Sequence, residues 1–265
     1  MREFECSSND ILEFIELAKR FSGNDLISKK DIVKNKIASF AKNKNIDSMK
    51  DICSKFQFDR ALRQEILNLI TINETYFMRE LNQLNSAIQY ANNISIGTNS
   101  VKILCAPCSS GEEVYSLGIL SKIIGIDRYK LKIIGIDINS QMIQKCKEGV
   151  YNERSVKNLR QSQKEIYFKK YENEYQIKQD LMPMIEFKTI NIFDDSLFSL
   201  GQFDVILSRN MMIYFDENYR LLTIERFAKI LKPYGRIYFG NADLVPYCDL
   251  YNKVVDLSST YYERV

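Results

Sequence analysis

The stretch from Val101 to Ser116, V-K-I-L-C-A-P-C-S-S-G-E-E-V-Y-S, most constrains the fold of this chain. Its apolar run, Val101 to Leu104, is typical of a buried parallel strand. Small residues follow, and a helical pattern then runs from Glu112 to about Ile124. A strand, a tight turn and a helix in this order predict the ligand crevice of a doubly wound α/β sheet, at the carboxyl ends of its strands.

A second strand is predicted from Leu131 to Ile136, and it ends in Asp137. An acidic residue at this position can accept hydrogen bonds from the two hydroxyl groups of a ribose. The sequence therefore predicts a cofactor that contains a nucleoside.

The turn between the first strand and its helix argues against a dinucleotide. The pyrophosphate fingerprint needs three glycines, whereas this turn has only Gly111, followed by Glu112 and Glu113. Two carboxylates would repel a phosphate, but they suit a cationic ligand such as S-adenosylmethionine. The alternative is that the glutamates only decorate a helix N-terminus, where the macrodipole favours negative charge. That alternative is weightier for Glu113 than for Glu112.

Composition narrows the chemistry further. The 265 residues include six cysteines and no histidine, which excludes Ser-His, Cys-His and His-dependent metal mechanisms. Cys105 and Cys108 form a C-x-x-C without a second pair, so we predict no metal site and leave a redox role open. We find no apolar run long enough to span a membrane and no leader peptide, and therefore expect a cytoplasmic protein without direct membrane insertion.

The first part of the chain is predicted to be helical. We expect residues 1–88 to form an N-terminal helical domain, whose first helix is capped by Asn9 or Asp10 and ended by Gly23. Between Lys19 and Arg63 there are 12 Lys and Arg against 5 Asp, a local excess of +7. This basic region suits an acidic protein surface or a nucleic acid, or it is a set of solvated helix faces.

The remainder, residues 89–265, is expected to form the catalytic domain. A tyrosine-rich stretch at about 152–184 interrupts the alternation of strands and helices, and it predicts a small antiparallel β insertion with a turn near Glu172 to Glu174. Further strands are predicted at 185–193, 203–210, 237–240 and 260–265. The predicted fold class is therefore α/β, a Rossmann-like methyltransferase sheet with an N-terminal all-helical domain and a small antiparallel insertion.

Several motifs together resemble the CheR family of chemoreceptor glutamate methyltransferases. N-E-T-Y-F-M-R-E, residues 73–80, is similar to the family's N-x-T-x-F-F-R-E, and C-S-S-G-E-E-V-Y-S is similar to its C-S-T-G-E-E-P-Y-S. I-D-I-N followed by E-G-V-Y matches the family's D-I-D segment, which ends in G-x-Y. F-D-V-I-L-S-R-N-M-M-I-Y-F matches F-D-x-I-F-C-R-N-V-x-I-Y-F. The chain departs from the pattern at Val114, Asn139, the Y-G-R turn and G-N-A-D, residues 240–243.

The resemblance implies a set of site residues. Those that line the S-adenosylmethionine pocket would be Asn73, Thr75, Arg79, Glu112, Asp137, Asn191, Ile192, Arg209 and Asn210. Arg79 and Tyr214 would be catalytic. Arg79 would bind a carboxylate of either the cofactor or the substrate, and Tyr214 would hydrogen-bond the substrate carboxylate, unless it is only a packed core aromatic.

The resemblance also implies the reaction and the partners. The chain would methylate glutamate side chains of methyl-accepting chemotaxis receptors and bind their acidic methylation helices. A receptor tail peptide would be a further contact, and no nucleic acid is expected. Two alternatives stay open: a nucleic-acid methyltransferase that uses the same basic region, and a cofactor-binding regulator without turnover.

Overall fold

The computed structural model describes residues 4–98, 100–256 and 259–265, which form two compact units. The smaller unit contains the residues up to Ile72 together with Tyr214–Arg220, and the larger contains Asn73–Ile213 and Leu221–Val265. The expected domain boundary between residues 88 and 89 falls inside α5 (Leu81–Gly97), a helix of the larger unit.

The smaller unit is helical. It is built from α1 (Ser8–Ser22), η1 (Ile27–Lys29), α2 (Lys30–Asn43), α3 (Met49–Phe58) and α4 (Arg60–Ile70). Its centre is aromatic and aliphatic, with Phe14 and Phe21 both packed on Phe56. The prediction for the cap of α1 is wrong in position: Ser7 and Asp10 form a capping box, because Ser7 Oγ accepts from Asp10 N and Asp10 Oδ2 accepts from Ser7 N. Gly23 ends α1 in the left-handed region, as predicted.

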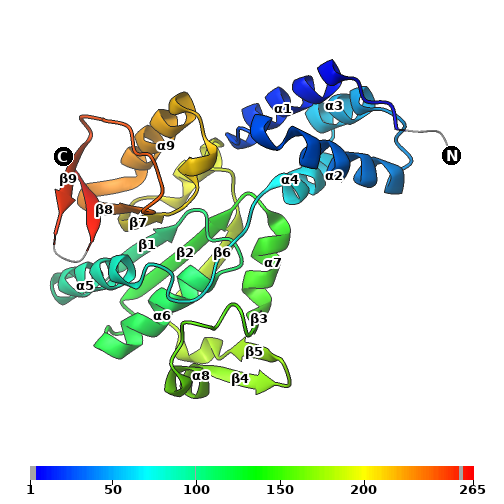
Figure 1. Ribbon diagram of the computed structural model, residues 1–265. Coiled ribbons are helices and arrows are strands. Elements are labelled where there is room, and N and C mark those ends of the chain that lie inside the picture. The colour runs from blue at the N-terminus through cyan, green and yellow to red at the C-terminus, as the bar shows by residue number, and fades with distance from the viewer. Residues whose placement is uncertain (1–3, 99, 257–258) are drawn as a thin grey trace. The chain divides into compact units, whose positions relative to one another are not determined.

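The larger unit is built on a seven-stranded sheet in the order β6-β2-β1-β7-β8-β10-β9 (Figure 1). Its strands are β1 (Val101–Cys105), β2 (Leu131–Asp137), β6 (Met184–Thr189), β7 (Phe203–Ser208), β8 (Leu231–Phe239), β9 (Tyr251–Val255) and β10 (Thr260–Arg264). The first five in the sheet order are parallel, whereas β10 and β9 are antiparallel. The predicted α/β class is confirmed.

Several strand predictions need correction. The strand predicted at 185–193 is β6 and ends at Thr189, and the strand predicted at 203–210 is β7 and ends at Ser208. β8 begins at Leu231, six residues earlier than expected, because Leu231 already pairs with Phe203 of β7. The register then shifts, and regular pairing resumes with Arg236 opposite Val205. β9 was not predicted, since it lies at the edge of the sheet and exposes Asn252 and Lys253 instead of an apolar run.

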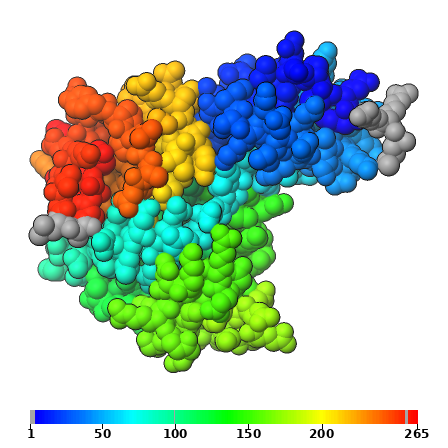
Figure 2. All heavy atoms as spheres, in the orientation of Figure 1, coloured from blue at the N-terminus to red at the C-terminus, as the bar shows by residue number. Residues whose placement is uncertain are grey.

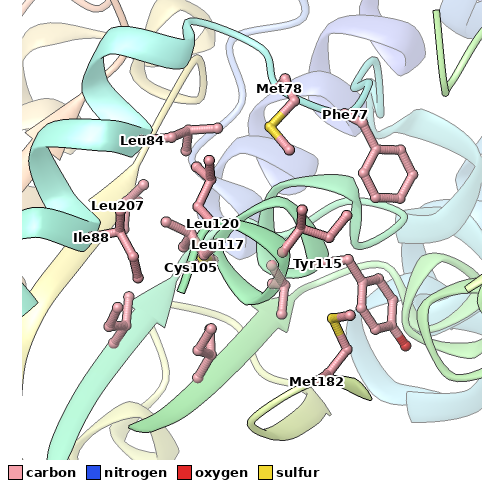
Figure 3. Packing of buried hydrophobic residues seen from close by; sticks show 14 of the residues in the cluster. Phe77, Met78, Leu84, Ile88, Cys105, Tyr115, Leu117, Leu120, Met182 and Leu207 are labelled. Atoms are coloured by element: carbon pink, nitrogen blue, oxygen red, sulfur yellow. The ribbon is translucent and has the colours of Figure 1, made fainter. Parts of the chain in front are cut away.

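The helices α5 and α6 (Glu112–Ile124) both contribute buried apolar residues to the core of the larger unit. Figure 3 shows Leu84 and Ile88 of α5 beside Leu117 and Leu120 of α6, with Cys105 and Leu207 from the strands in the same cluster. Helices α7 (Ser140–Glu148) and α9 (Glu217–Ile230) complete the alternation of strands and helices. The chain order therefore follows the doubly wound plan that the first strand, turn and helix predicted.

The insertion is a separate three-stranded antiparallel sheet in the order β3-β5-β4. It contains β3 (Val150–Asn152), α8 (Gln161–Tyr167), β4 (Phe168–Tyr171) and β5 (Glu174–Ile177). The predicted turn lies between β4 and β5, where Glu172 has a φ of 45°. In Figure 2 this insertion, coloured yellow-green, projects from one end of the larger unit.

The described part of the chain contains no helix that is both long and apolar enough to cross a membrane.

Gly149 fixes the insertion to α7, because it ends that helix with a φ of 64° and its carbonyl accepts a hydrogen bond from Ile177 N. A Cβ at Gly149 would lie 2.6 Å from Ile177 Cγ2, whereas a Cβ at Gly125, which ends α6 with a φ of 83°, would meet nothing within 4 Å. We expect Gly125→Ala to cost about 1 kcal/mol of unfolding free energy through backbone strain. Gly149→Ala should cost about 1–3 kcal/mol more, through overpacking. Urea denaturation of both variants measures the difference, and equal losses would contradict this role of Gly149.

Candidate functional site

The candidate site lies at the carboxyl edge of the parallel strands. Strands β2 and β7 flank β1 in the sheet, so the chain order reverses between β1 and β7. Ligands of open α/β sheets bind at such a switch point. The ends of β1, β2, β6 and β7 and the segments that follow them carry the predicted residues Glu112, Asp137, Asn191 with Ile192, and Arg209 with Asn210. Because parallel strands end at the same edge, the structure brings these residues to one edge of the sheet.

Asp137 joins the turns after β1 and β2. Its Oδ2 accepts from Ser109 N at 2.9 Å, and its Oδ1 accepts from Asn139 N at 2.8 Å. The backbone oxygen of Asp137 accepts from Ile190 N at 3.0 Å, which places the segment before Asn191 beside it. Asp137 is 4% exposed, and burial raises its pKa to about 6 even though the backbone N–H groups lower it. The carboxylate oxygens keep further lone pairs for a ligand hydroxyl.

Glu112 is the first residue of α6 and is only 2% exposed. Ser110 Oγ donates to its Oε2 at 2.7 Å, and Ser155 Oγ donates to its Oε1 at 3.0 Å. Burial raises the pKa of the carboxyl, which the two serine hydroxyls partly offset. Glu112 is therefore held by side chains from two separate parts of the larger unit, and it does more than decorate a helix end.

The segment from Asn73 to Glu80 is fixed to the same unit by its backbone. Phe77 N donates to Ser155 O at 2.9 Å, Met78 N donates to Ser116 Oγ at 3.0 Å, and Arg79 O accepts from Arg209 Nη2 at 2.6 Å. Asn73 and Thr75 are half-buried residues in a stretch without regular secondary structure. No helix begins there, since α5 starts only at Leu81.

Arg79 has contacts of its own within this segment. Its Nη1 donates to Glu74 O at 2.9 Å, and its guanidinium lies 5.7 Å from the centroid of the Tyr76 ring. The side chain is half-buried. These contacts involve neighbours in the chain, so they leave its predicted carboxylate-binding role a prediction.

Arg209 is the centre of a buried charged cluster. Its side chain is 2% exposed, with Nη1 at 2.7 Å from Glu113 Oε2 and Nη2 at 3.4 Å from Glu80 Oε2. Burial raises the pKa of Glu113, and Arg209 opposes that shift. Since two carboxylates surround one guanidinium, the cluster carries a net negative charge when both are ionised.

Asn210 follows with a φ of 58°, and Asp243 holds it in this conformation. Asp243 Oδ2 accepts from Asn210 N at 2.6 Å and from Gly240 N at 2.8 Å. Asn210 Nδ2 donates to Glu80 Oε1 at 3.3 Å. The G-N-A-D turn, which departs from the family pattern, thus still supplies a carboxylate that fixes the end of β7. Asn139, another departure, caps α7 by accepting from Gln141 N and Met142 N.

Four residues of this region were missed from sequence: Ser155, Glu113, Glu80 and Asp243. Glu113 was expected to be a helix-end decoration, yet it pairs with Arg209. Ser155 carried no signal, because it lies in the polar stretch between β3 and α8 and meets Glu112 only through the fold. The one usable signal was the position of Arg209 at the end of a predicted buried strand, because a buried guanidinium is almost always paired with a carboxylate.

Tyr214 belongs to the smaller unit. Its carbonyl accepts from Asp25 N at 2.7 Å, and Lys29 Nζ lies 5.1 Å from the centroid of its ring. The side chain is half-buried, so it is not the fully packed core aromatic of the alternative interpretation.

Comparisons with known proteins decide the family. The family described as CheR methyltransferase, SAM binding domain, matches residues 73–261. The chain belongs to the CheR methyltransferase family. A chemotaxis protein methyltransferase of Campylobacter jejuni is 42% identical over 98% of this chain and 97% of that protein. Chemotaxis protein methyltransferase 2 of Vibrio cholerae is 34% identical over 71% of this chain and 68% of that protein, and the Salmonella typhimurium enzyme is 28% identical over 81% and 76%.

The resemblance drawn from the motifs is therefore confirmed. This member of the CheR family is an S-adenosylmethionine-dependent methyltransferase. The residues at the carboxyl edge fit that cofactor, because two buried carboxylates, Asp137 and Glu112, suit ribose hydroxyls and a cationic amino acid end. In addition, the hydroxyls of Ser109 and Ser208 at this edge are buried without a hydrogen-bond partner among the described residues.

Removing the cation of the buried cluster should destabilise the larger unit. Arg209→Met leaves Glu113 and Glu80 without their guanidinium, and we expect a loss of about 3–5 kcal/mol in unfolding free energy. The control is Lys132→Met, which breaks the Lys132–Glu186 pair at 2.6 Å between partners 26% and 36% exposed, and should cost less than about 1 kcal/mol. Urea denaturation of both variants makes the comparison. Similar small losses would show that the cluster does not stabilise the fold.

Proposed function

We propose that this chain transfers a methyl group from S-adenosylmethionine to glutamate side chains of chemoreceptors and so forms glutamate methyl esters. The observation that carries the proposal is the CheR family match from Asn73 to residue 261, which includes the whole candidate site. Relatives named chemotaxis protein methyltransferase, similar over nearly the full chain, support the chemotaxis role. The reaction would take place in the cytoplasm.

The side-chain inventory suits this reaction. A glutamate carboxyl has a pKa of about 4.3, so the nucleophile is already ionised at neutral pH. When bound, S-adenosylmethionine supplies a methyl group activated by its positively charged sulfur. The chain then has to align the carboxylate with that methyl group and exclude water, which needs no imidazole base. A chain without histidine is compatible with such chemistry.

The cofactor would be held by the carboxyl edge and the segment before α5. We propose that Asp137 binds the ribose and that Glu112 faces the cationic amino acid end. The remaining cofactor-binding residues would be Asn73, Thr75, Arg79, Asn191, Ile192, Arg209 and Asn210. Of these, the structure gives Arg209 mainly protein partners, Glu113 and Arg79 O, so its contribution would be to fix the segment around Arg79.

The substrate would be bound by Arg79 and Tyr214, the proposed catalytic residues. Arg79 would bind a carboxylate of the cofactor or the substrate, and the Tyr214 hydroxyl would hydrogen-bond the target carboxylate. Residues 1–88 were expected to form a helical domain separate from residues 89–265. We propose that this helical domain recognises the receptor. Lys34 and Lys42 on α2 are exposed and complement acidic methylation helices. The insertion would provide a second contact, with a receptor tail peptide.

A labelling experiment tests the proposed function. The chain is incubated with S-adenosylmethionine that carries a labelled methyl group, with receptor-containing membranes and with RNA. Label on the receptor that is released by mild base indicates glutamate methyl esters, as proposed. Label on RNA would contradict the proposal in favour of a nucleic-acid methyltransferase, and binding without transfer would contradict it in favour of a regulator.

Cofactor affinity should depend on pH through Asp137. Its pKa of about 6 means that the carboxyl is protonated below this pH and a weaker acceptor for ribose hydroxyls. Binding favours the ionised form, so the affinity for S-adenosylmethionine should be at its maximum above pH 6. Below pH 6 it should fall by up to about tenfold per pH unit. Asp137→Asn should bind the cofactor more weakly and lose the part of the pH dependence that comes from Asp137. The other buried carboxyls titrate in both proteins, so their contribution cancels in the comparison. Calorimetric titration from pH 5 to 7.5 measures it, and identical pH profiles would remove Asp137 from the site.

Tyr214→Phe should lower turnover more than cofactor affinity. Loss of one hydrogen bond to a charged group corresponds to a decrease of about 10- to 100-fold in kcat. The Kd for S-adenosylmethionine should stay within about twofold of the wild-type value. Radiometric kinetics and calorimetry give the two values. An equal loss in both, or no loss in either, would contradict the role assigned to the hydroxyl.

Reversing charge on α2 should weaken receptor binding. We expect Lys34→Glu with Lys42→Glu to lower affinity at 0.1 M salt and to have little effect at 1 M, where the Debye length falls from about 10 Å to about 3 Å. The control, Lys122→Glu with Lys253→Glu, makes the same charge change at exposed positions of the larger unit. Binding isotherms at several salt concentrations decide the point. If both pairs bind receptor as the wild type does at low salt, α2 is only a solvated surface.

A further inference from the structure

The segment that carries Tyr214 is packed with the helical unit, although it lies far from that unit in sequence. Residues Tyr214–Arg220 belong to the same compact unit as α1 to α4, whereas the residues on both sides of this segment belong to the larger unit. The segment follows β7, which ends at Ser208, and includes the first residues of α9. Of the two proposed catalytic residues, Arg79 therefore belongs to the larger unit and Tyr214 to the helical unit.

Two kinds of contact fix the residues at Tyr214 itself. Asp25 N donates to Tyr214 O at 2.7 Å, and an antiparallel bridge joins the neighbouring residues Asn24 and Phe215. These backbone contacts set the position of the chain. Lys29 Nζ, 5.1 Å from the centroid of the Tyr214 ring, is close enough for a cation–π contact with the side chain.

Asp216 ties the same segment to α1 through an ion pair. Lys19 Nζ lies 2.6 Å from Asp216 Oδ2, and the two side chains are 22% and 29% exposed. The other oxygen, Oδ1, accepts from Tyr219 N at 2.9 Å and so caps α9. One carboxylate thus fixes both the start of α9 and its attachment to α1, two residues after Tyr214.

We infer that Lys19 is a positioning residue for Tyr214: through Asp216 it holds the segment 214–216 so that the tyrosine hydroxyl has one orientation towards the substrate carboxylate. This inference rests on the proposed function, since it needs Tyr214 to contact the substrate. The physical reason is pre-organisation. A side chain on a connecting segment aligns a reacting group only if its backbone is held, and a misplacement on the order of 1 Å is costly to turnover.

The first test separates turnover from binding. Lys19→Met keeps most of the aliphatic stem but removes the ion pair, and we expect kcat at saturating receptor to fall about three- to tenfold. The Kd for S-adenosylmethionine should stay within about twofold of the wild type. Lys19→Arg keeps the charge and should restore at least half of the wild-type kcat. Because kcat is measured at saturating receptor, a contribution of Lys19 to receptor binding would change KM and not kcat.

A matched control and a double-mutant cycle exclude a general effect on stability. Lys132→Met breaks an ion pair of the same 2.6 Å length and similar exposure in the larger unit, and should leave kcat unchanged. In the Tyr214→Phe background Lys19→Met should cost less than about twofold, because a residue that acts through the hydroxyl has nothing left to position. Asp216→Asn, which keeps an acceptor for the cap of α9, should reproduce the loss seen with Lys19→Met.

The outcomes are distinguishable. An active wild type whose kcat is unaffected by Lys19→Met, or a full further loss in the Tyr214→Phe background, would overturn the positioning role alone. A loss of cofactor affinity equal to the loss of kcat would overturn it as well, because the effect would then be a general one. A wild-type chain that transfers no methyl group to receptor would overturn the proposed function together with this inference.

Discussion

The hydrogen bonds that Asp137 accepts from two turns are the interaction on which the candidate site depends. One carboxylate oxygen holds the turn after β1, and the other holds the turn after β2. Both turns lie where adjacent parallel strands end, so the group that fixes the edge of the sheet is also the group that we propose binds the ribose. Burial makes these hydrogen bonds strong and the negative charge costly, which is why the pKa of Asp137 lies above its ordinary value.

The rest of the edge follows the same physical pattern. Glu112 and Glu113 are consecutive carboxylates with raised pKa values, yet they have different partners: serine hydroxyls for Glu112 and a guanidinium for Glu113. The serine hydroxyls carry no charge, so they do not neutralise Glu112, and Lys145 contributes only the weakest of the effects that lower its pKa. Arg209, in contrast, pairs directly with Glu113. A cationic cofactor would supply the missing positive charge at Glu112. The neighbouring Glu113 is bonded to Arg209 within the protein, so of these two adjacent residues we assign only Glu112 to the cofactor.

The sequence allowed much of this fold to be predicted, for identifiable reasons. Apolar runs in β1, β2 and β7 and the small-residue turn at residues 106–111 were strong local signals, as was Gly23 at the end of α1. What could not be predicted depends on contacts between distant residues. Ser155 meets Glu112 across 43 positions of the chain, and Arg209 meets Glu113 across 96. The edge strand β9 had no apolar run. Residues 73–76 carry capping residues without a helix, and the backbone that follows them, at Phe77 and Met78, bonds to Ser155 and Ser116 instead.

Amide hydrogen exchange with and without S-adenosylhomocysteine, the demethylated product, tests the central claim most directly. If the cofactor binds at the carboxyl edge, the amides of residues 106–111, 137–139 and 190–192 and those just after β7 should exchange more slowly with the ligand present. The insertion strands β4 and β5, in the same larger unit, should be unaffected and serve as the internal reference. Protection confined to other parts of the chain, with no change at the turns after β1 and β2, would contradict the account.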